Sequence, residues 1–296
     1  MSRRDRRADP TRGATDTMNT PPKAKLFVEG RYLKHSRDLP QTVFFCPECK
    51  GHPRRRRNCE KCEGFGKLTK DSVQELIGWV LGKAAGTRKH KFHGAGREDV
   101  DVRMLGEGRP FVMELVEPRI AQVDLAEVEA TINSRNEGRL EVRGLHWTQK
   151  GRVRFLKEGT FAKEYRARVE VDERPTEEAA AALVGRRYEI AQQTPSRVAH
   201  RRADKVRERW IEVLDVALDP EDERHLDITI RTQAGTYVKE AISGEGGMSK
   251  PSIAELLGVG RAACVSLDVL AILDEEGEGE PGGAEPSTAP FGAGLS

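Results

Sequence analysis

The sequence predicts an α/β or α+β domain built on one long mixed sheet. Between two polar ends, the apolar pattern switches repeatedly between the helical period of about 3.6 residues and the strand period of about 2. Strand patterns outnumber helical ones, which favours a single extended sheet with few covering helices. The glycines near residue 95 precede a strand instead of joining a strand to a helix, so a dinucleotide-binding fold is not expected.

Each predicted element combines a hydrophobic period with a start signal. Ser72 and Glu75 form a capping box ahead of an apolar stripe that continues to Ala84, and Asp124 with Glu127 opens a second helix. Further helices are expected over the alanine-rich segment 176–184 and, briefly, after residue 252. Strands are expected at 100–105, 111–116, 140–147, 163–171, 209–218, 226–231 and 263–272.

The two ends of the chain differ in composition from the middle. Residues 1–24 are arginine-rich and residues 274–296 are rich in Gly, Pro, Glu and Ser, so we expect a disordered basic arm and a disordered acidic tail. Residues 274–286 hold six acidic and no basic residues, which leaves 50 basic against 42 acidic residues in 1–273. No run approaches the roughly 18 apolar residues of a membrane span, and no apolar signal core follows the arginines. We expect a cytoplasmic protein with a basic folded part and no membrane contact.

Two cysteine pairs predict a structural metal site. The pairs have the CxxC spacing and are separated by nine residues, which lets four thiolates face one tetrahedral zinc ion. Four consecutive arginines, 54–57, lie on the connecting loop and would place a cationic patch beside the metal. The alternatives are reduced thiols without metal and replacement of one sulfur by His52. The expected zinc ligands are Cys46, Cys49, Cys59 and Cys62.

A second basic cluster occupies residues 197–209. It has few apolar positions and follows a turn-like Thr194-Pro195, so we expect a loop or an exposed ribbon. Such a cluster suits phosphate contacts, although a charge run can equally be a solvated face. Together with the ribbon and the net charge, it favours a nucleic-acid partner.

Several longer motifs carry a family resemblance. The segment HGAGREDVDVRMLG at 93–106, followed by GRPFV at 108–112, strongly resembles the tRNA pseudouridine-54/55 synthases of archaea and animals. The resemblance continues through FVEGRYLKHSRDLPQT (27–42), KEYRARV (163–169), QQTPSRVAHRR (192–202), AGTYVKE (234–240) and KPSIAELLG (250–258). It covers the chain from about Leu26 to Leu273.

The resemblance implies an architecture and an activity. It implies an α+β pseudouridine synthase catalytic domain at 71–273, with a long, mixed, mostly antiparallel sheet and flanking helices, preceded at 25–70 by a lead-in strand and the zinc ribbon. It also implies an RNA-uridine isomerase that modifies uridine 54, uridine 55 or both in the TΨC arm of tRNA, without a cofactor for catalysis. Family members carry a further N-terminal domain that helps hold tRNA. A separate tRNA-binding domain or chain is therefore considered as a partner beside tRNA.

The resemblance further implies one essential aspartate, for which two residues compete. Pseudouridine formation breaks the uracil N1–C1′ bond and joins C5 to C1′. In a strand that begins near Asp99, residues 99, 101 and 103 would share one face. Asp101 stands five residues before Gly106, as in other pseudouridine synthases, whereas Asp99 follows Arg97 in an Arg-x-Asp pattern found in some of them. We assign catalysis to Asp101 and expect Asp99 to shape the electrostatic field around it. The alternative is that either aspartate only forms an ion pair with a neighbouring arginine.

The remaining site residues follow from the same motifs. Tyr165 matches the family tyrosine that stacks on the target uracil, and Tyr237 matches a second substrate-contacting tyrosine. Lys239 matches the basic residue that pairs with the catalytic carboxylate, and Leu267 matches a leucine beneath the site. Outside this resemblance the two tyrosines and the leucine would be ordinary strand, turn and core residues. The expected backbone contacts to RNA are Arg197, His200, Arg201 and Arg202.

Two other classes of function compete with the enzyme. A non-catalytic tRNA-binding or chaperone protein could retain the fold, but every mapped catalytic position is filled by a compatible residue. A redox or metal-storage role for the cysteines would explain nothing outside residues 46–62.

Overall fold

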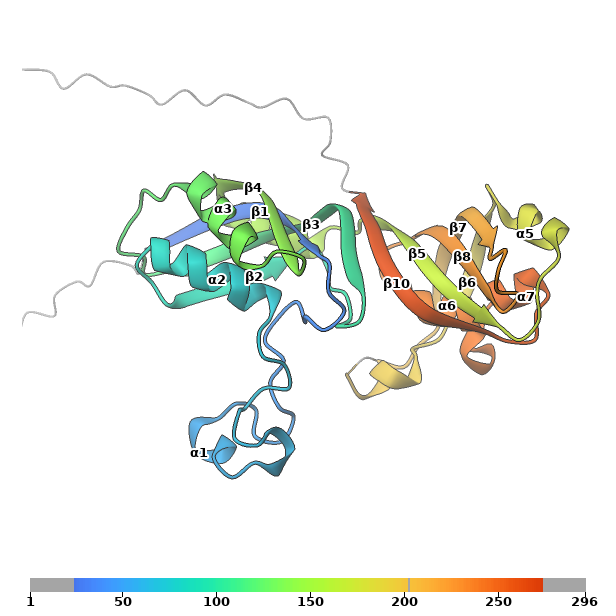
Figure 1. The fold of residues 1–296 in the computed structure, drawn as a ribbon, viewed down its shortest axis with the longest axis horizontal. Helices are drawn as coiled ribbons and strands as arrows, with labels where there is room; N and C mark the ends of the chain where they lie inside the picture. The colour runs from blue at the N-terminus through green and yellow to red at the C-terminus, as the bar shows by residue number, and fades with distance from the viewer. Residues whose placement is uncertain (1–23, 202, 274–296) are drawn as a thin grey trace, which may run out of the picture.

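The structure is a computed structural model that describes residues 24–201 and 203–273 (Figure 1). The expected tail lies outside these residues, as does the expected arm except for Ala24. None of the helices in the described ranges combines the length and the hydropathy of a membrane span.

The described residues form a strand-rich framework with short covering helices. The strands are β1 (Lys25–Lys34), β2 (Lys89–Gly94), β3 (Arg103–Val116), β4 (Leu140–Thr148), β5 (Ala162–Val171), β6 (Arg187–Gln192), β7 (Arg207–Leu218), β8 (His225–Thr232), β9 (Ser249–Lys250) and β10 (Ala262–Leu273). The α-helices are α1 (Pro53–Arg56), α2 (Val73–Ala84), α3 (Leu125–Arg135), α4 (Lys150–Glu158), α5 (Glu177–Leu183), α6 (Val238–Ser243) and α7 (Ile253–Leu257). Short 3-10 helices are η1 (Glu60–Cys62), η2 (Ser196–Arg201) and η3 (Gly244–Gly247).

One sheet runs through the whole framework. Its strand order is β4-β1-β3-β10-β5-β8-β7-β6-β9, and β2 pairs with β3 beside this path. The pairs are antiparallel except β3 with β10, which is parallel and joins Arg103 to Asp268 and Val269 to Met104. The predicted long, mixed, mostly antiparallel sheet is thus confirmed, and the short β3–β10 junction connects its two halves (Figure 1).

Two of the predicted strands proved to be one. The segments expected at 100–105 and 111–116 belong to the continuous β3, which begins only at Arg103. Gly106 and Gly108 both have positive φ, so the strand bends there without ending. The short polar strands β2 and β6 and the helices α4 and α6 were not predicted, because their apolar positions are too few to give a clear period.

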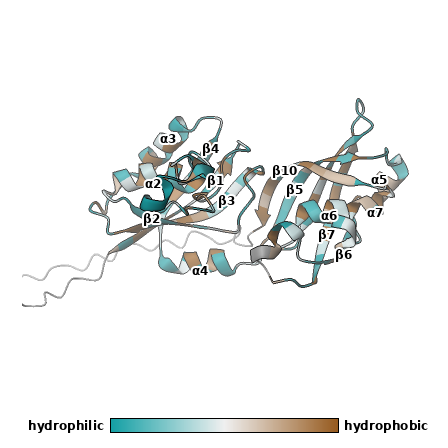
Figure 2. Ribbon diagram, turned by 90° about the horizontal axis from the view of Figure 1, so that it is seen from below, coloured by the Kyte–Doolittle hydropathy of each residue, from teal (hydrophilic) through white to brown (hydrophobic). Residues whose placement is uncertain are grey.

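Alternation along β3 divides the first half of the molecule into layers. Phe111 and Met113 join the main core, in which α2 and α3 cover one face of the sheet. Val112, between them in sequence, points to the other face and packs with Leu156 of α4 in a smaller cluster. Figure 2 accordingly shows α4 on the opposite side of the strands from α2 and α3. In the second half, α5, α6 and α7 pack against the sheet from the main-core side.

The cysteine segment is a separate small unit attached below α2 (Figure 1). Its entry and exit are held together by an isolated bridge between Phe45 and Lys67 and by a 2.8 Å hydrogen bond from Leu68 N to the Phe44 carbonyl. Few apolar residues other than the cysteines are buried in it, so the four cysteines make up its core.

Candidate active site

The two competing aspartates lie on a turn, and the expected strand is absent at this position. Residues 97–102 precede β3, and Val102 N donates to the Asp99 carbonyl at 3.2 Å. The expectation that residues 99, 101 and 103 share one strand face was therefore wrong. Because the chain turns, the two carboxylates point to different partners. Arg103 does not pair with either aspartate, because it forms a bidentate ion pair with Asp268 at 2.8 and 2.5 Å.

Two basic residues from the start of the chain, the buried Lys34 and the half-buried Arg37, hold this turn. Lys34, at the end of β1 and fully buried, donates its Nζ to the carbonyls of Leu39, Asp99 and Val100 at 2.9, 3.1 and 2.9 Å. Burial lowers the pKa of Lys34, although the carboxylate of Glu98 opposes that change. Arg37 donates to the Asp101 carbonyl at 2.9 Å. The sequence motif 27–42 contained both residues, but nothing in the pattern indicated that they support the turn.

Asp101 pairs with Lys239, as the family resemblance implied. The ammonium of Lys239, in the first turn of α6, lies 2.7 Å from Oδ2 of Asp101. Partial burial would raise the pKa of Asp101, but the hydrogen bond and charge of Lys239 outweigh it, so the pKa lies below its ordinary value of 3.8. Asp101 is therefore an ionised carboxylate at neutral pH, with more than half of its side chain open to solvent.

Asp99 is engaged by a different cation. Arg197 donates to Oδ2 of Asp99 at 3.1 Å and grips Glu240 of α6 at 2.5 and 3.2 Å. Its guanidinium also lies 5.9 Å from the centre of the Tyr237 ring. Arg197, expected to bind RNA, is thus bound within the protein, and it ties the η2 loop to both the turn and α6.

The rest of the expected RNA-binding cluster is only partly described. The segment 196–201 forms the 3-10 helix η2, a loop element consistent with the expected loop and not an extended ribbon. Ser196 donates from its hydroxyl to Glu245 at 2.5 Å, which fixes the start of η2 beside η3. Arg202 and the side chains of His200 and Arg201 lie outside what the structure describes.

The turn, β5, β10 and α6 surround a central cleft of about 790 Å³. Tyr165, Tyr237, Lys239 and Leu267, all predicted as substrate-binding, line it together with Asp99. Tyr165 lies opposite Val269 of β10 and Ile230 of β8 in the sheet, so its backbone is held by a strand on each side. The structure therefore brings the four predicted substrate-binding residues to one cleft, whereas Asp101 is not among its lining residues and adjoins it through Lys239.

Further residues in and below the cleft were not predicted. Lys163 lines it and donates to the Phe161 carbonyl at 2.8 Å; burial and the nearby Arg109 lower the pKa of Lys163 to about 8. Below Tyr165, Arg109 pairs with Glu98 at 2.8 Å, and both side chains are 1% exposed. Burial raises the pKa of Tyr165 to about 12, while Arg109 opposes the rise. The Tyr165 hydroxyl is thus protonated at neutral pH.

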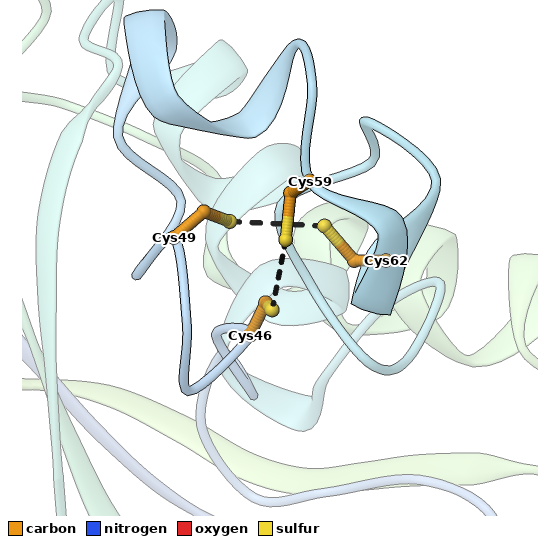
Figure 3. A group of neighbouring side chains, drawn as sticks. All are labelled: Cys46, Cys49, Cys59 and Cys62. Carbon is orange, nitrogen blue, oxygen red and sulfur yellow. Dashed lines mark hydrogen bonds between the residues drawn. The ribbon is translucent and has the colours of Figure 1, made fainter.

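The four ribbon cysteines converge on one point, as predicted. Their Sγ atoms all lie within 4.8 Å of one another, and the pairs Cys46–Cys59 and Cys49–Cys62 are each 3.7 Å apart (Figure 3). A tetrahedral zinc with Zn–S bonds of about 2.3 Å would space its sulfurs by about 3.8 Å, so the cluster is compatible with that ion. His52 is not among these ligands, because its Nδ1 accepts from Arg54 N at the start of α1.

Local backbone geometry favours the thiolate form at one of these positions. The backbone N–H of Cys49 donates to the Cys46 sulfur and lowers the pKa of Cys46 to about 7. Gly66 N also donates to the Cys62 sulfur at 3.1 Å. Gly51 and Gly64, expected to serve the turns, have φ of +69° and +81°. The turns therefore need glycine at these positions.

Comparison with known proteins places the chain in a family. A family model described as "Pus10, C-terminal" matches residues 27–273, which is nearly all of the described chain. The chain belongs to the Pus10 family. The matched range contains the central cleft and the cysteine ribbon.

Curated relatives of this Pus10-family chain carry the name tRNA pseudouridine synthase Pus10. One from Halorubrum lacusprofundi is 45% identical over 258 residues, which is 86% of this chain and 59% of that protein. One from Methanopyrus kandleri is also 45% identical over 258 residues and is covered over 57% of its length. The chain thus spans somewhat more than half of these relatives. Among solved structures, a Cbf5–Nop10–Gar1 complex matches 81% of this chain and 57% of the matched chain, with a TM-score of 0.37 and 18% identity.

Proposed function

We propose that this chain isomerises uridine to pseudouridine in the TΨC arm of tRNA, at position 54, 55 or both. The observation that carries the proposal is the ionised Asp101 paired with Lys239, because Lys239 lines the cleft together with two tyrosines; Asp101 itself is not among the lining residues and reaches the cleft through this pair. Membership of the Pus10 family, whose curated members are named tRNA pseudouridine synthases, supports it.

The proposed chemistry needs the carboxylate and no cofactor. The uracil N1–C1′ bond breaks and N1 leaves with the bonding electron pair. Asp101 either adds to C1′ or takes the proton from the neighbouring sugar carbon. The uracil then turns and C5 forms the new bond to C1′; at this step the Asp101–C1′ bond breaks in the first case, and Asp101 returns the proton to the sugar carbon in the second. C5 loses its proton and N1 gains one, so the product is an isomer of the substrate.

The other cleft residues would hold the detached base and its sugar. The protonated Tyr165 offers a flat ring on which a uracil can stack and turn. Lys239 keeps Asp101 ionised after the substrate excludes water, because an adjacent ammonium favours the charged carboxylate. The target uridine must be flipped out of its stack, which costs a few kcal/mol. Contacts from the cleft arginines Arg207 and Arg209 to the phosphates would offset this cost.

We also propose that Cys46, Cys49, Cys59 and Cys62 hold one structural zinc ion. The Sγ spacings carry this assignment. The ion would stabilise the ribbon and its arginine helix α1, far in sequence from the catalytic motifs, and it would take no part in the isomerisation.

Two matched substitutions test the catalytic assignment. Asp101→Asn keeps the size of the side chain but removes its charge, so pseudouridine formation in an unmodified tRNA transcript should fall below detection while tRNA still binds. Asp99→Asn should retain measurable activity, because Asp99 faces Arg197. Pseudouridine is mapped by sequencing after chemical modification. Activity lost in Asp99→Asn and kept in Asp101→Asn would reverse the assignment, and a wild-type chain that binds tRNA without modifying it would favour a binding protein.

A further inference from the structure

The first half of the molecule contains a second cleft, which is lined by residues that the central site does not use. It has a volume of about 1000 Å³ and shares no lining residue with the central cleft. It forms where α2 ends and the chain returns as β2, the strand beside the main path of the sheet (Figure 1). The cleft therefore belongs to a part of the fold for which the isomerisation gives no role.

Two glycines of α2 create this cleft. A Cβ on Gly78 would lie 2.3 Å from Cε1 of His90, and one on Gly82 would lie 2.7 Å from the Thr87 carbonyl oxygen. Real Cβ atoms do not approach so closely; at Gly78 the His90 ring would have to move, and at Gly82 the contact is with backbone, so glycine at 82 lets the returning segment 86–90 pack against the helix. This close packing places the side chains of the returning segment around the cleft opening.

Three cations surround the cleft without an acidic partner. Lys83, Arg88 and Arg119 line it and are exposed, and within the described ranges no ion pair or side-chain hydrogen bond engages their charged groups. A fourth cation, Lys89, is neutralised by Glu117 at 2.6 Å. Most other arginines around the sheet, such as Arg103 and Arg231, are paired with carboxylates. A concave surface with three free cations suits an anionic ligand.

An aromatic ring stands beside these cations. Trp79 lines the cleft and is 53% exposed, although the neighbouring α2 residues Ile77 and Leu81 are fully buried. Among the described residues that line this cleft, Trp79 is the one large hydrophobic side chain; the others are glycines, charged residues, Thr87 and His90. An apolar peptide would find little to bury here. A flat ring among free cations instead matches a nucleotide, whose base can stack while its phosphates meet the cations.

We infer that the α2–β2 cleft is a second RNA-binding surface, which holds phosphates and an unstacked base of the tRNA away from the target uridine. The inference rests on the proposed tRNA substrate and extends it to a different part of that molecule. It assigns Arg88 and Arg119 to phosphates and Trp79 to the base.

The test compares two double variants. Arg88→Ala with Arg119→Ala should weaken binding of an unmodified tRNA transcript about tenfold at low salt and reduce the slope of log K against log salt concentration by about 2. Arg186→Ala with Arg261→Ala removes two exposed arginines from the other half of the molecule, away from both clefts, and should change neither quantity. Trp79→Ala should weaken binding about tenfold, and Trp79→Phe should restore most of it because a ring remains.

Several outcomes would overturn the inference. It fails if Arg88→Ala with Arg119→Ala leaves affinity and salt slope unchanged, or if the control pair weakens binding equally. It also fails if these variants change the oligomeric state of the chain while tRNA binding stays the same, since the cleft would then be a protein contact. Pseudouridine formation by the wild-type chain is scored separately, so a chain that binds tRNA through this cleft but does not isomerise uridine would refute only the proposed function.

Discussion

The buried pair of Arg109 and Glu98 gives the sharpest prediction about stability. Both side chains are 1% exposed, and the guanidinium also donates to the Ala95 carbonyl at 2.7 Å. Arg109→Met keeps the length of the side chain but removes the guanidinium that pairs with Glu98, leaving this carboxylate with the Tyr32 hydroxyl, which donates to it at 2.8 Å, and with the charge of the nearby Lys34. Breaking a buried pair by removing one partner costs about 3–5 kcal/mol. That is a large part of the 5–15 kcal/mol by which a typical domain is stable.

The companion variant Glu98→Gln with Arg109→Met separates the lost pairing from lost packing. It removes both charges, and the new amide oxygen can still accept from Tyr32. We expect it to recover more than half of the stability that Arg109→Met loses, because no unpaired charge stays buried.

Urea denaturation followed by circular dichroism measures both variants at neutral pH. A loss below about 1 kcal/mol, or a double variant no more stable than Arg109→Met, would show that this pair does not hold the Ala95–Asp101 segment.

Two further predictions concern the ribbon and Lys163. Purified chain should contain about one zinc per molecule by atomic absorption, and Cys59→Ser with Cys62→Ser should release it; full zinc content in that variant would refute the four-cysteine site. Lys163 has a pKa of about 8 in the folded chain, below the ordinary value of 10.5 that it has in the unfolded chain. Between these two pKa values the unfolded chain binds more protons than the folded chain. The free energy of unfolding should therefore rise with pH across this range, by at most about 3 kcal/mol. Lys163→Met should lack this component, and identical pH profiles of unfolding free energy for the two chains would contradict the burial argument.

The sequence predicted those parts of the site that depend on local spacing. Two CxxC pairs nine residues apart were sufficient to place four sulfurs together, because each pair closes its own turn. The family motifs predicted that Lys239 pairs with the catalytic carboxylate and that Tyr165 and Leu267 belong to the site; the structure pairs Lys239 with Asp101 and places Tyr165 and Leu267 in the lining of one cleft, and the roles of these residues stay predictions. The strands with clear alternation, such as β5 and β8, were also found near their actual bounds.

The parts that failed depend on partners far away in the chain. The pattern of residues 99–105 alternates as a strand should, but Lys34 and Arg37 bind its carbonyls from more than 60 residues earlier and hold it as a turn. Arg197 stays a predicted RNA contact, but the ion pairs that it forms with Glu240 and Asp99 could not be read from its basic neighbours in the sequence. Periodicity carries no information about such long-range ion pairs.

The position of β10 has a consequence for how the chain folds as it is made. This strand is the last in the described sequence, yet it lies in the middle of the sheet, between β3 and β5. Until the ribosome has released residue 273, β3 and β5 each present an unpaired edge, and the two halves of the sheet have no strand to join them. Completion of the sheet, and with it of the cleft that Leu267 and Val269 line, therefore waits for the release of β10, and nascent chains short of this strand are the species most exposed to aggregation.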